Sequence, residues 1–145
     1  MNLMVLKVYY LLLYTNMKIL IFGLSGSGKT TLANRLNKYL GYTRINADEI
    51  RALCNDWDFT TEGRLRQAKR LKKLSDIPKD SITDFIAPTA EMRTIFNADI
   101  TIWMDTVSSS KYEDTDVLFE NPIDVNYHVT DKDAAKWAKL IYEDI

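Results

Sequence analysis

Eight consecutive residues, from Gly23 to Thr30, have the types and spacing of a loop that binds the phosphates of a nucleotide. The segment fits the pattern of a glycine, any four residues, and then Gly-Lys-Thr. In such a loop the glycines let successive backbone N–H groups point at a polyphosphate. The Lys29 ammonium then reaches the β- and γ-phosphates, and the Thr30 hydroxyl ligates Mg²⁺. The sequence therefore predicts a site for a nucleoside triphosphate with Mg²⁺, made by Gly23, Leu24, Ser25, Gly26, Ser27, Gly28, Lys29, Thr30 and Thr31.

The residues on either side of this loop support the prediction. The run 18–22 before it is short and apolar apart from Lys18, as in a buried parallel strand. After the loop, apolar residues recur at helical spacing as far as Gly41, a typical stop at a helix C-terminus. A Gly-Ser linker can match the loop pattern by chance, but it is not expected between a strand and a helix.

An acidic segment follows the second predicted strand, which runs from Tyr42 to Ala47. Asp48 and Glu49 come at the carboxyl end of this strand, beside the expected phosphate loop. A carboxylate there is well placed for Mg²⁺ or for a nucleophile. A simpler interpretation is that the two acids cap the short helix that runs to Cys54. Both roles can hold at once.

A strongly basic helix is predicted from Thr61 to Leu74, with apolar residues every three positions. Such a run of charge is usually a solvated face. Alternatively, Arg64 and Gln67, three apart in the first turns, meet an anionic substrate, because arginine forks suit sulfate and phosphate oxygens.

Strands and helices alternate along the remainder of the chain. Three further strands are predicted at 81–86, 100–104 and 126–129, with a short helix over 89–96 and a final helix capped by Thr130 or Asp131. The polar stretch 105–124 is the candidate for a mobile lid. The alternation predicts an α/β three-layer fold of the P-loop type, with about five mostly parallel strands and helices on both faces.

Length and composition indicate one globular domain. The chain has 145 residues, 46% of them hydrophobic, and a net charge of −1, so no global field favours nucleic acid or anionic lipid. A single cysteine excludes an internal disulfide, and with a single histidine it excludes a Cys/His metal cluster. His128 is expected to be structural. We expect a cytoplasmic monomer or homodimer that binds a small nucleotide, without nucleic acid or membrane as partner.

The segment 1–16 is expected to be an extension outside the domain 17–145. Leu3 to Tyr14 is apolar except for Lys7, yet too short to span a bilayer as a helix and without a small-residue cleavage site. Met17 is a natural start, because the first strand opens at once. We therefore expect either an upstream start codon or a family-specific extension, and an added strand or a surface helix are the alternatives.

Four ordered segments between about Lys18 and Asp105 resemble the adenylylsulfate kinase family. They are the phosphate loop through Ala33, the segment 46–51 (Asn-Ala-Asp-Glu-Ile-Arg), the turn 56–59 (Asp-Trp-Asp-Phe) followed by Arg64 and Gln67, and 85–88 (Phe-Ile-Ala-Pro). The resemblance implies transfer of the γ-phosphate of ATP to the 3′-hydroxyl of adenylyl sulfate.

By this resemblance, Asp48 would orient or deprotonate the hydroxyl and help Thr30 to hold Mg²⁺, while Lys29 assists transfer. The substrate would be bound by Arg51 and Arg64 at its phosphosulfate, by Phe59 at its adenine, and by Gln67 and Ile86 along the pocket.

The sequence departs from the family pattern at Asn46, Ala47, Glu49, Gln67 and Ala87. Its stretch 105–124 is shorter than the family's lid and acidic, with Lys111 as its one positive charge. Two alternatives therefore stay open. One is a kinase for another nucleoside, nucleotide or polynucleotide-end hydroxyl, and the other is an inactive ATP-binding module.

Overall fold

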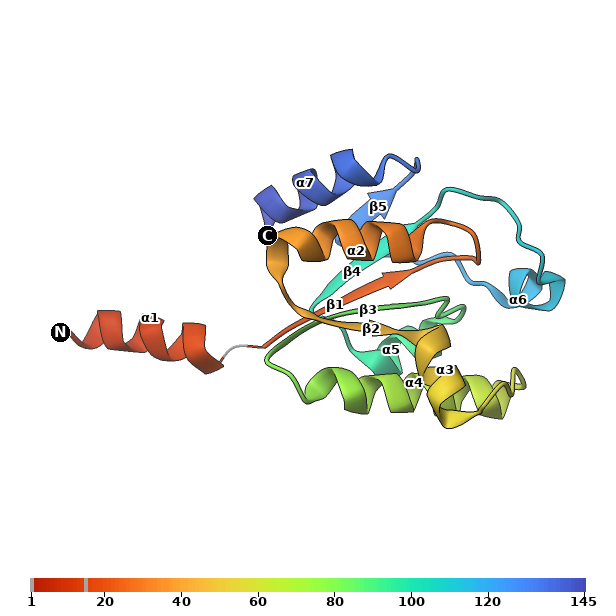
Figure 1. Ribbon diagram of the computed structural model, residues 1–145, viewed down its shortest axis with the longest axis horizontal. Coiled ribbons are helices and arrows are strands. Elements are labelled where there is room, and N and C mark those ends of the chain that lie inside the picture. The colour runs from red at the N-terminus through yellow and green to blue at the C-terminus, as the bar shows by residue number, and fades with distance from the viewer. Residues whose placement is uncertain (1, 15) are drawn as a thin grey trace.

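A computed structural model describes residues 2–14 and 16–145 of the chain (Figure 1). Within these residues five strands form one sheet in the order β2-β3-β1-β4-β5, and all neighbouring strands are parallel. The strands are β1 (Met17–Phe22), β2 (Thr43–Asn46), β3 (Asp80–Phe85), β4 (Ile100–Met104) and β5 (Tyr127–Val129). The predicted parallel sheet is confirmed.

The central strand β1 is buried on both faces, which explains its apolar run from Ile19 to Phe22. Because side chains alternate along a strand, Ile19 and Ile21 pack into one core with α2 (Lys29–Leu40). Leu20 and Phe22 pack into a second core on the opposite face. One short run of sequence therefore joins both halves of the domain.

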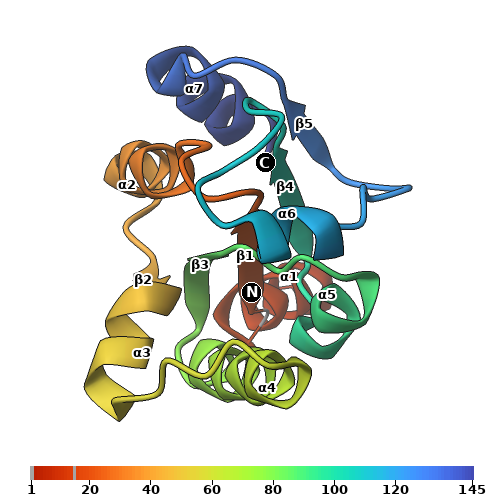
Figure 2. The ribbon, with the colours of Figure 1, turned by 90° about the vertical axis from the view of Figure 1, so that its right-hand side faces the viewer.

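Helices cover both faces of the sheet (Figure 2). One face is covered by α2 and α7 (Ala134–Asp144), and the other by α3 (Ala47–Cys54), α4 (Thr61–Asp76) and α5 (Ala90–Phe96). The short helix α6 (Glu113–Leu118) lies beyond the carboxyl ends of the strands (Figure 1). This arrangement confirms the predicted three-layer α/β fold.

The strand order marks the ligand-binding edge of the sheet. From β1 the chain passes to β2 and β3 on one side and to β4 and β5 on the other, so the neighbours of β1 are β3 and β4. Open α/β sheets bind ligands outside the carboxyl ends of the strands at such a point. The loop 23–30 follows β1 at this edge.

The N-terminal segment forms α1 (Leu3–Tyr14), which projects away from the domain beside the start of β1 (Figure 1). The side chains of residues 2–10 are all exposed, although most are apolar. In the structure this segment is therefore a helix and not an added strand. In the part of the chain that the structure describes, no helix is long and apolar enough to cross a membrane.

Two predicted helix caps are wrong. Helix α3 is capped by Asn46, whose side-chain oxygen accepts from the backbone N–H of Glu49 at 3.0 Å, so Asp48 and Glu49 lie in the first turn instead. Helix α7 is capped by Asp133, not by Thr130 or Asp131. The Asp131 carboxylate instead accepts from the backbone N–H of Asp133 and from side chains of the first turn.

Candidate active site

The loop 23–30 has the backbone geometry of a phosphate cradle. Gly28, which precedes α2, has φ +98°, in the left-handed region that favours glycine. At Gly23 the constraint is space, because a Cβ atom would lie 2.5 Å from the carbonyl oxygen of Met104. The loop is therefore held against the end of β4 and leads directly into the N-terminus of a twelve-residue helix, where free N–H groups attract anions.

Lys29 reaches back over the loop, and its Nζ donates to the carbonyl oxygen of Leu24 at 2.8 Å. Burial lowers the pKa of this ammonium to about 8, although the carboxylates of Asp84 and Asp48 act in the opposite direction. Lys29 is thus a cation that gains from a bound anion. A polyphosphate beside it would raise the pKa of Lys29 again and so stabilise its charged form.

We expect the affinity for a nucleoside triphosphate to fall as the pH rises above about 8. In the free protein Lys29 then loses its proton, whereas the bound phosphates favour the charged form, so binding must take up a proton. The affinity should fall by up to about tenfold per pH unit above that pKa. Titration of a fluorescent ATP analogue between pH 7 and 9.5 measures this. Lys29→Arg, which stays charged throughout, should show no such fall, and an equal slope in that variant would contradict the assignment.

A carboxylate that the sequence prediction missed lies behind Thr30. The hydroxyl of Thr30 donates to Asp84 Oδ2 at 2.9 Å, and Asp84 is only 2% exposed. Its sequence signal is an acid one residue before the end of a strand, β3. Mg²⁺ is commonly bound by one or two protein oxygens together with substrate phosphates, and Thr30 with Asp84 fits that donor set.

Within the described part of the chain, Thr30 and Asp84 do not belong to a larger cluster of metal-ligating side chains. Among residues 2–14 and 16–145, no group of three or more His, Cys, Asp or Glu side chains is arranged to hold an ion. A cation at Thr30 and Asp84 would therefore depend on the nucleotide for its remaining ligands.

Asp48 lies in the first turn of α3 with an exposed side chain. Its charge acts on both Lys29 and Arg51, so the carboxylate lies within electrostatic reach of the phosphate loop and of Arg51. Within the described residues it makes no hydrogen bond or ion pair. An uncommitted carboxylate at this place is free to act on a ligand.

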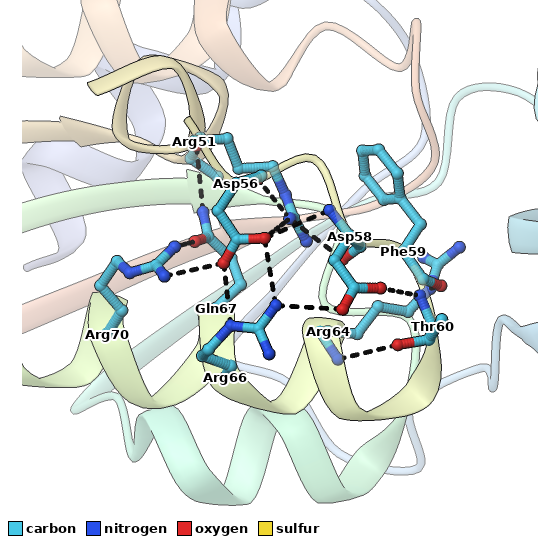
Figure 3. Close-up of polar contacts among 11 residues, drawn as sticks. Arg51, Asp56, Asp58, Phe59, Thr60, Arg64, Arg66, Gln67 and Arg70 are labelled. Carbon is cyan, nitrogen blue, oxygen red and sulfur yellow. Dashed lines mark hydrogen bonds and ion pairs between the residues drawn. The ribbon is translucent and has the colours of Figure 1, made fainter. Parts of the chain in front are cut away.

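Two buried arginines hold the turn that carries Phe59 (Figure 3). Arg51 Nη1 donates to the carbonyls of Asp56 at 2.9 Å and Asp58 at 3.2 Å, and its guanidinium lies over the Phe59 ring at 4.4 Å. Arg64 Nε donates to the Phe59 carbonyl at 2.8 Å. The ring remains 47% exposed, so it offers a supported flat surface to a ligand.

Much of the basic charge of α4 is neutralised internally. Asp56 accepts hydrogen bonds from Arg66 and Arg70, which hold its pKa well below the usual range (Figure 3). Gln67 is also committed, because its amide donates to the Ala47 carbonyl at 3.0 Å and accepts from Arg70 at 2.7 Å. These contacts tie α4 to α3 and to the Phe59 turn.

Gly63→Ala should destabilise this turn. A Cβ atom on Gly63 would overlap the carbonyl oxygen and the carboxyl group of Asp58, and both belong to the network around Phe59. Overpacking of this kind costs about 1–3 kcal/mol. Urea unfolding measures the loss, and Glu62→Ala, at an exposed position one residue away, is the control and should change stability little. Equal stability of the Gly63→Ala variant and the wild type would mean that the turn relaxes freely.

The segment 105–124 contains α6 and is anchored on the domain. Thr115 is buried, and its hydroxyl accepts from Arg64 Nη2 at 2.9 Å, with the Asp114 carboxylate 3.4 Å from the same nitrogen. Further along, Glu120 accepts from the backbone N–H of Ala90 at 2.9 Å. The acidic helix α6 thus lies against one of the arginines proposed to bind the acceptor.

The remaining sequence-predicted residues lie at the same edge. Ile86, half-buried, follows β3 directly, and Thr31 lies one residue beyond the phosphate loop. A cavity of about 230 Å³ adjoins that loop, and no sequence motif predicts it. Its lining includes Gly28, Thr31, Val129 and Trp137.

His128 lies outside this cavity lining. Its ring stacks on Trp103, and its Nε2 lies 2.8 Å from Asp105 Oδ2.

The parallel sheet, the glycine-rich loop after its central strand and the lysine and threonine that end the loop define a P-loop domain of the kinase type. A family model described as AAA domain, AAA_33, matches residues 19–120 of the chain. The chain belongs to this family.

Similar proteins agree with the resemblance seen in the sequence. An adenylyl-sulfate kinase of Prochlorococcus marinus is 38% identical over 76 residues, which cover 46% of this chain and 38% of that protein. The chain thus spans well under half of this curated relative's length.

Two solved structures share the fold. The Mycobacterium tuberculosis APS kinase in complex with AMPPNP and APS matches with a TM-score of 0.74 and 18% identity, over 89% of this chain and 96% of that one. Shikimate kinase from Acinetobacter baumannii in complex with shikimate matches with a TM-score of 0.65 and 18% identity, over 91% and 94%.

Proposed function

We propose that this protein is an ATP-dependent phosphotransferase that transfers the γ-phosphate of ATP to the 3′-hydroxyl of adenylyl sulfate. In this proposal residues 17–145 form the kinase domain and the segment 105–124 acts as its lid. One observation carries the proposal: the uncommitted carboxylate of Asp48 acts electrostatically on Lys29 of the phosphate loop and on Arg51, and Arg51 together with Arg64 lies against the exposed ring of Phe59.

The donor side needs little beyond positioning and charge neutralisation. The backbone N–H groups of the loop and the Lys29 ammonium hold the β- and γ-phosphates. Thr30 and Asp84 would hold Mg²⁺, which neutralises phosphate charge when bound. The cavity lined by Thr31, Val129 and Trp137 offers apolar surface for the base of ATP.

The acceptor side activates an alcohol. Asp48 accepts the proton of the 3′-hydroxyl while the oxygen of that hydroxyl bonds to the γ-phosphorus. The bond from the γ-phosphorus to the bridging oxygen of ADP breaks at the same time. Phe59 stacks on the adenine of the acceptor. Arg51 and Arg64 hold its phosphosulfate with the N–H groups not used in the turn, and Gln67 and Ile86 line the pocket.

The names of similar proteins support this choice of acceptor. The Prochlorococcus relative is an adenylyl-sulfate kinase, and the M. tuberculosis structure contains AMPPNP and APS. The same fold also occurs in a shikimate kinase, so the fold alone does not select the acceptor. An exposed aromatic ring favours an acceptor that carries a flat base.

A second candidate is transfer to a nucleoside or other alcohol without a phosphosulfate. It is favoured by the contact of Arg64 with Thr115 and Asp114, because a guanidinium already beside a carboxylate has less need of an anionic ligand.

An acceptor screen tests the proposal. Purified protein is incubated with ATP, Mg²⁺ and one of four acceptors: adenylyl sulfate, a nucleoside, a nucleotide or a 5′-hydroxyl oligonucleotide. Mass spectrometry should detect 3′-phosphoadenylyl sulfate as the main product, formed at least about 100-fold more slowly with Lys29→Met. Phosphorylation of a different acceptor would support the second candidate. ATP binding without transfer to any acceptor would defeat the proposed function and favour an inactive nucleotide-binding module.

A further inference from the structure

Three polar side chains from two neighbouring strands gather behind Thr30. Arg44 and Asn46 are two residues apart on β2, so both point to the same face of the sheet. Asn46 is paired in register with Asp84 on β3. That face is the one covered by α2, because Arg44 Nε donates to Asn34 of this helix at 3.2 Å.

The two oxygens of the Asp84 carboxylate have separate partners. Oδ1 lies 2.8 Å from Arg44 Nη2. Oδ2 accepts from Asn46 Nδ2 at 2.9 Å and from the Thr30 hydroxyl at 2.9 Å. The carboxylate is therefore held from both sides, with one oxygen turned to the phosphate loop.

Arg44 is itself fixed. Its Nη1 donates to the Ile82 carbonyl at 3.1 Å and to the Ile45 carbonyl at 3.3 Å. Its side chain is 20% exposed, whereas that of Asp84 is 2% exposed. Burial of a carboxylate without a partner costs free energy, and the ion pair with Arg44 offsets this cost for Asp84 at the ligand-binding edge.

We propose that Arg44 and Asn46 are positioning residues that orient Asp84 so that Oδ2 and the Thr30 hydroxyl together hold the divalent cation of the nucleotide. This inference rests on the nucleotide site of the proposed function and goes beyond it. Mg²⁺ demands near-ideal octahedral geometry, so a ligand that can rotate binds it poorly. Loss of an outer partner of a metal ligand typically costs about 10–100-fold in metal affinity.

The test measures how much Mg²⁺ strengthens binding of a fluorescent ATP analogue, as the ratio of the dissociation constants in EDTA and in excess Mg²⁺. Asp84→Asn gives the ratio without the carboxylate. We expect Arg44→Met to lower the wild-type ratio at least about tenfold, towards that of Asp84→Asn, with binding in EDTA nearly unchanged. Arg44→Lys keeps the positive charge but loses the forked guanidinium, and its ratio should lie between those of the wild type and Arg44→Met.

Asn46 is tested with Asn46→Ser, since serine also caps a helix but its short hydroxyl replaces the amide that bonds Asp84. We expect about a threefold to tenfold lower ratio. Arg35→Met, at an exposed position on α2, is the matched control and should keep the wild-type ratio. If Arg44→Met does not fold, Arg44→Lys decides the role of Arg44.

The outcomes separate this inference from the proposed function. Wild-type ratios in Arg44→Lys and Asn46→Ser would overturn the positioning roles, as would a wild-type protein whose nucleotide binding ignores Mg²⁺. A wild-type protein that binds the nucleotide more tightly with Mg²⁺, yet phosphorylates no acceptor, defeats only the proposed function. In that case a lowered ratio in the variants still supports the inference.

Discussion

Lys29→Met is expected to lower the rate of phosphoryl transfer by about 10²–10³-fold. The Lys29 ammonium is the positive charge that the loop itself carries toward the phosphates, and a bound anion offsets the burial that lowers its pKa. Methionine keeps much of the side-chain volume, so the loss should reflect charge and not packing. Single-turnover rates with saturating ATP, Mg²⁺ and adenylyl sulfate measure it.

Lys38→Met is the matched control for this variant, because Lys38 lies on the same helix with an exposed side chain. It should transfer phosphate at the wild-type rate. A Lys29→Met protein that binds the nucleotide and retains more than about a tenth of the wild-type rate would show that the loop N–H groups suffice.

The phosphate loop could be predicted from sequence because all of its parts are local. Its glycines, Lys29 and Thr30 are adjacent in the chain, and strand β1 and helix α2 flank them directly. The strand 100–104 was predicted with the bounds that β4 has in the structure, since polar residues close it on both sides. Local signals of this kind need no knowledge of the strand order.

Asp84 was missed in the sequence because its place beside the phosphate loop depends on the strand order. It is 54 residues from Thr30 in the sequence, and the two meet only because β3 lies beside β1. Arg44 on β2 likewise finds its partner, Asp84, on the neighbouring strand β3. The predicted cap of α3 was wrong for a related reason. The helix starts where β2 leaves the sheet, so Asn46 is the cap residue and Asp48 and Glu49 follow it in the first turn.

The basic helix α4 shows how tertiary contacts change the meaning of a charge pattern. The sequence left open a solvated face or an anion site at Arg64 and Gln67. In the structure Arg66 and Arg70 pair with Asp56, which lies in the turn before the helix, so part of the charge is structural. Arg64 lies at the acceptor edge but is shared between the Phe59 turn and Thr115. The periodicity of the sequence does not reveal which arginines of α4 form structural ion pairs and which lie at the acceptor edge.

Asp48→Asn is expected to reduce transfer by about 10²–10⁴-fold while the affinity for ATP stays within a few-fold of the wild type. In the proposed mechanism this carboxylate takes the proton of the acceptor hydroxyl, and an amide cannot. Its exposed, uncommitted side chain means that the substitution removes no hydrogen bond within the described residues. Transfer rates with adenylyl sulfate and binding of a fluorescent ATP analogue measure the two effects separately.

Glu49→Gln provides the control, because it removes the same charge from the next position of the first turn of α3, also exposed. It should keep near-wild-type transfer. A second readout does not depend on catalysis: the Asp48 carboxylate raises the pKa of Lys29, so Asp48→Asn should lower the pH at which ATP affinity begins to fall. Equal transfer rates in Asp48→Asn and Glu49→Gln would place the base elsewhere. A pH profile that shifts in Asp48→Asn but not in Glu49→Gln would still locate Asp48 beside the phosphate loop, because a carboxylate can raise the pKa of Lys29 only at short range.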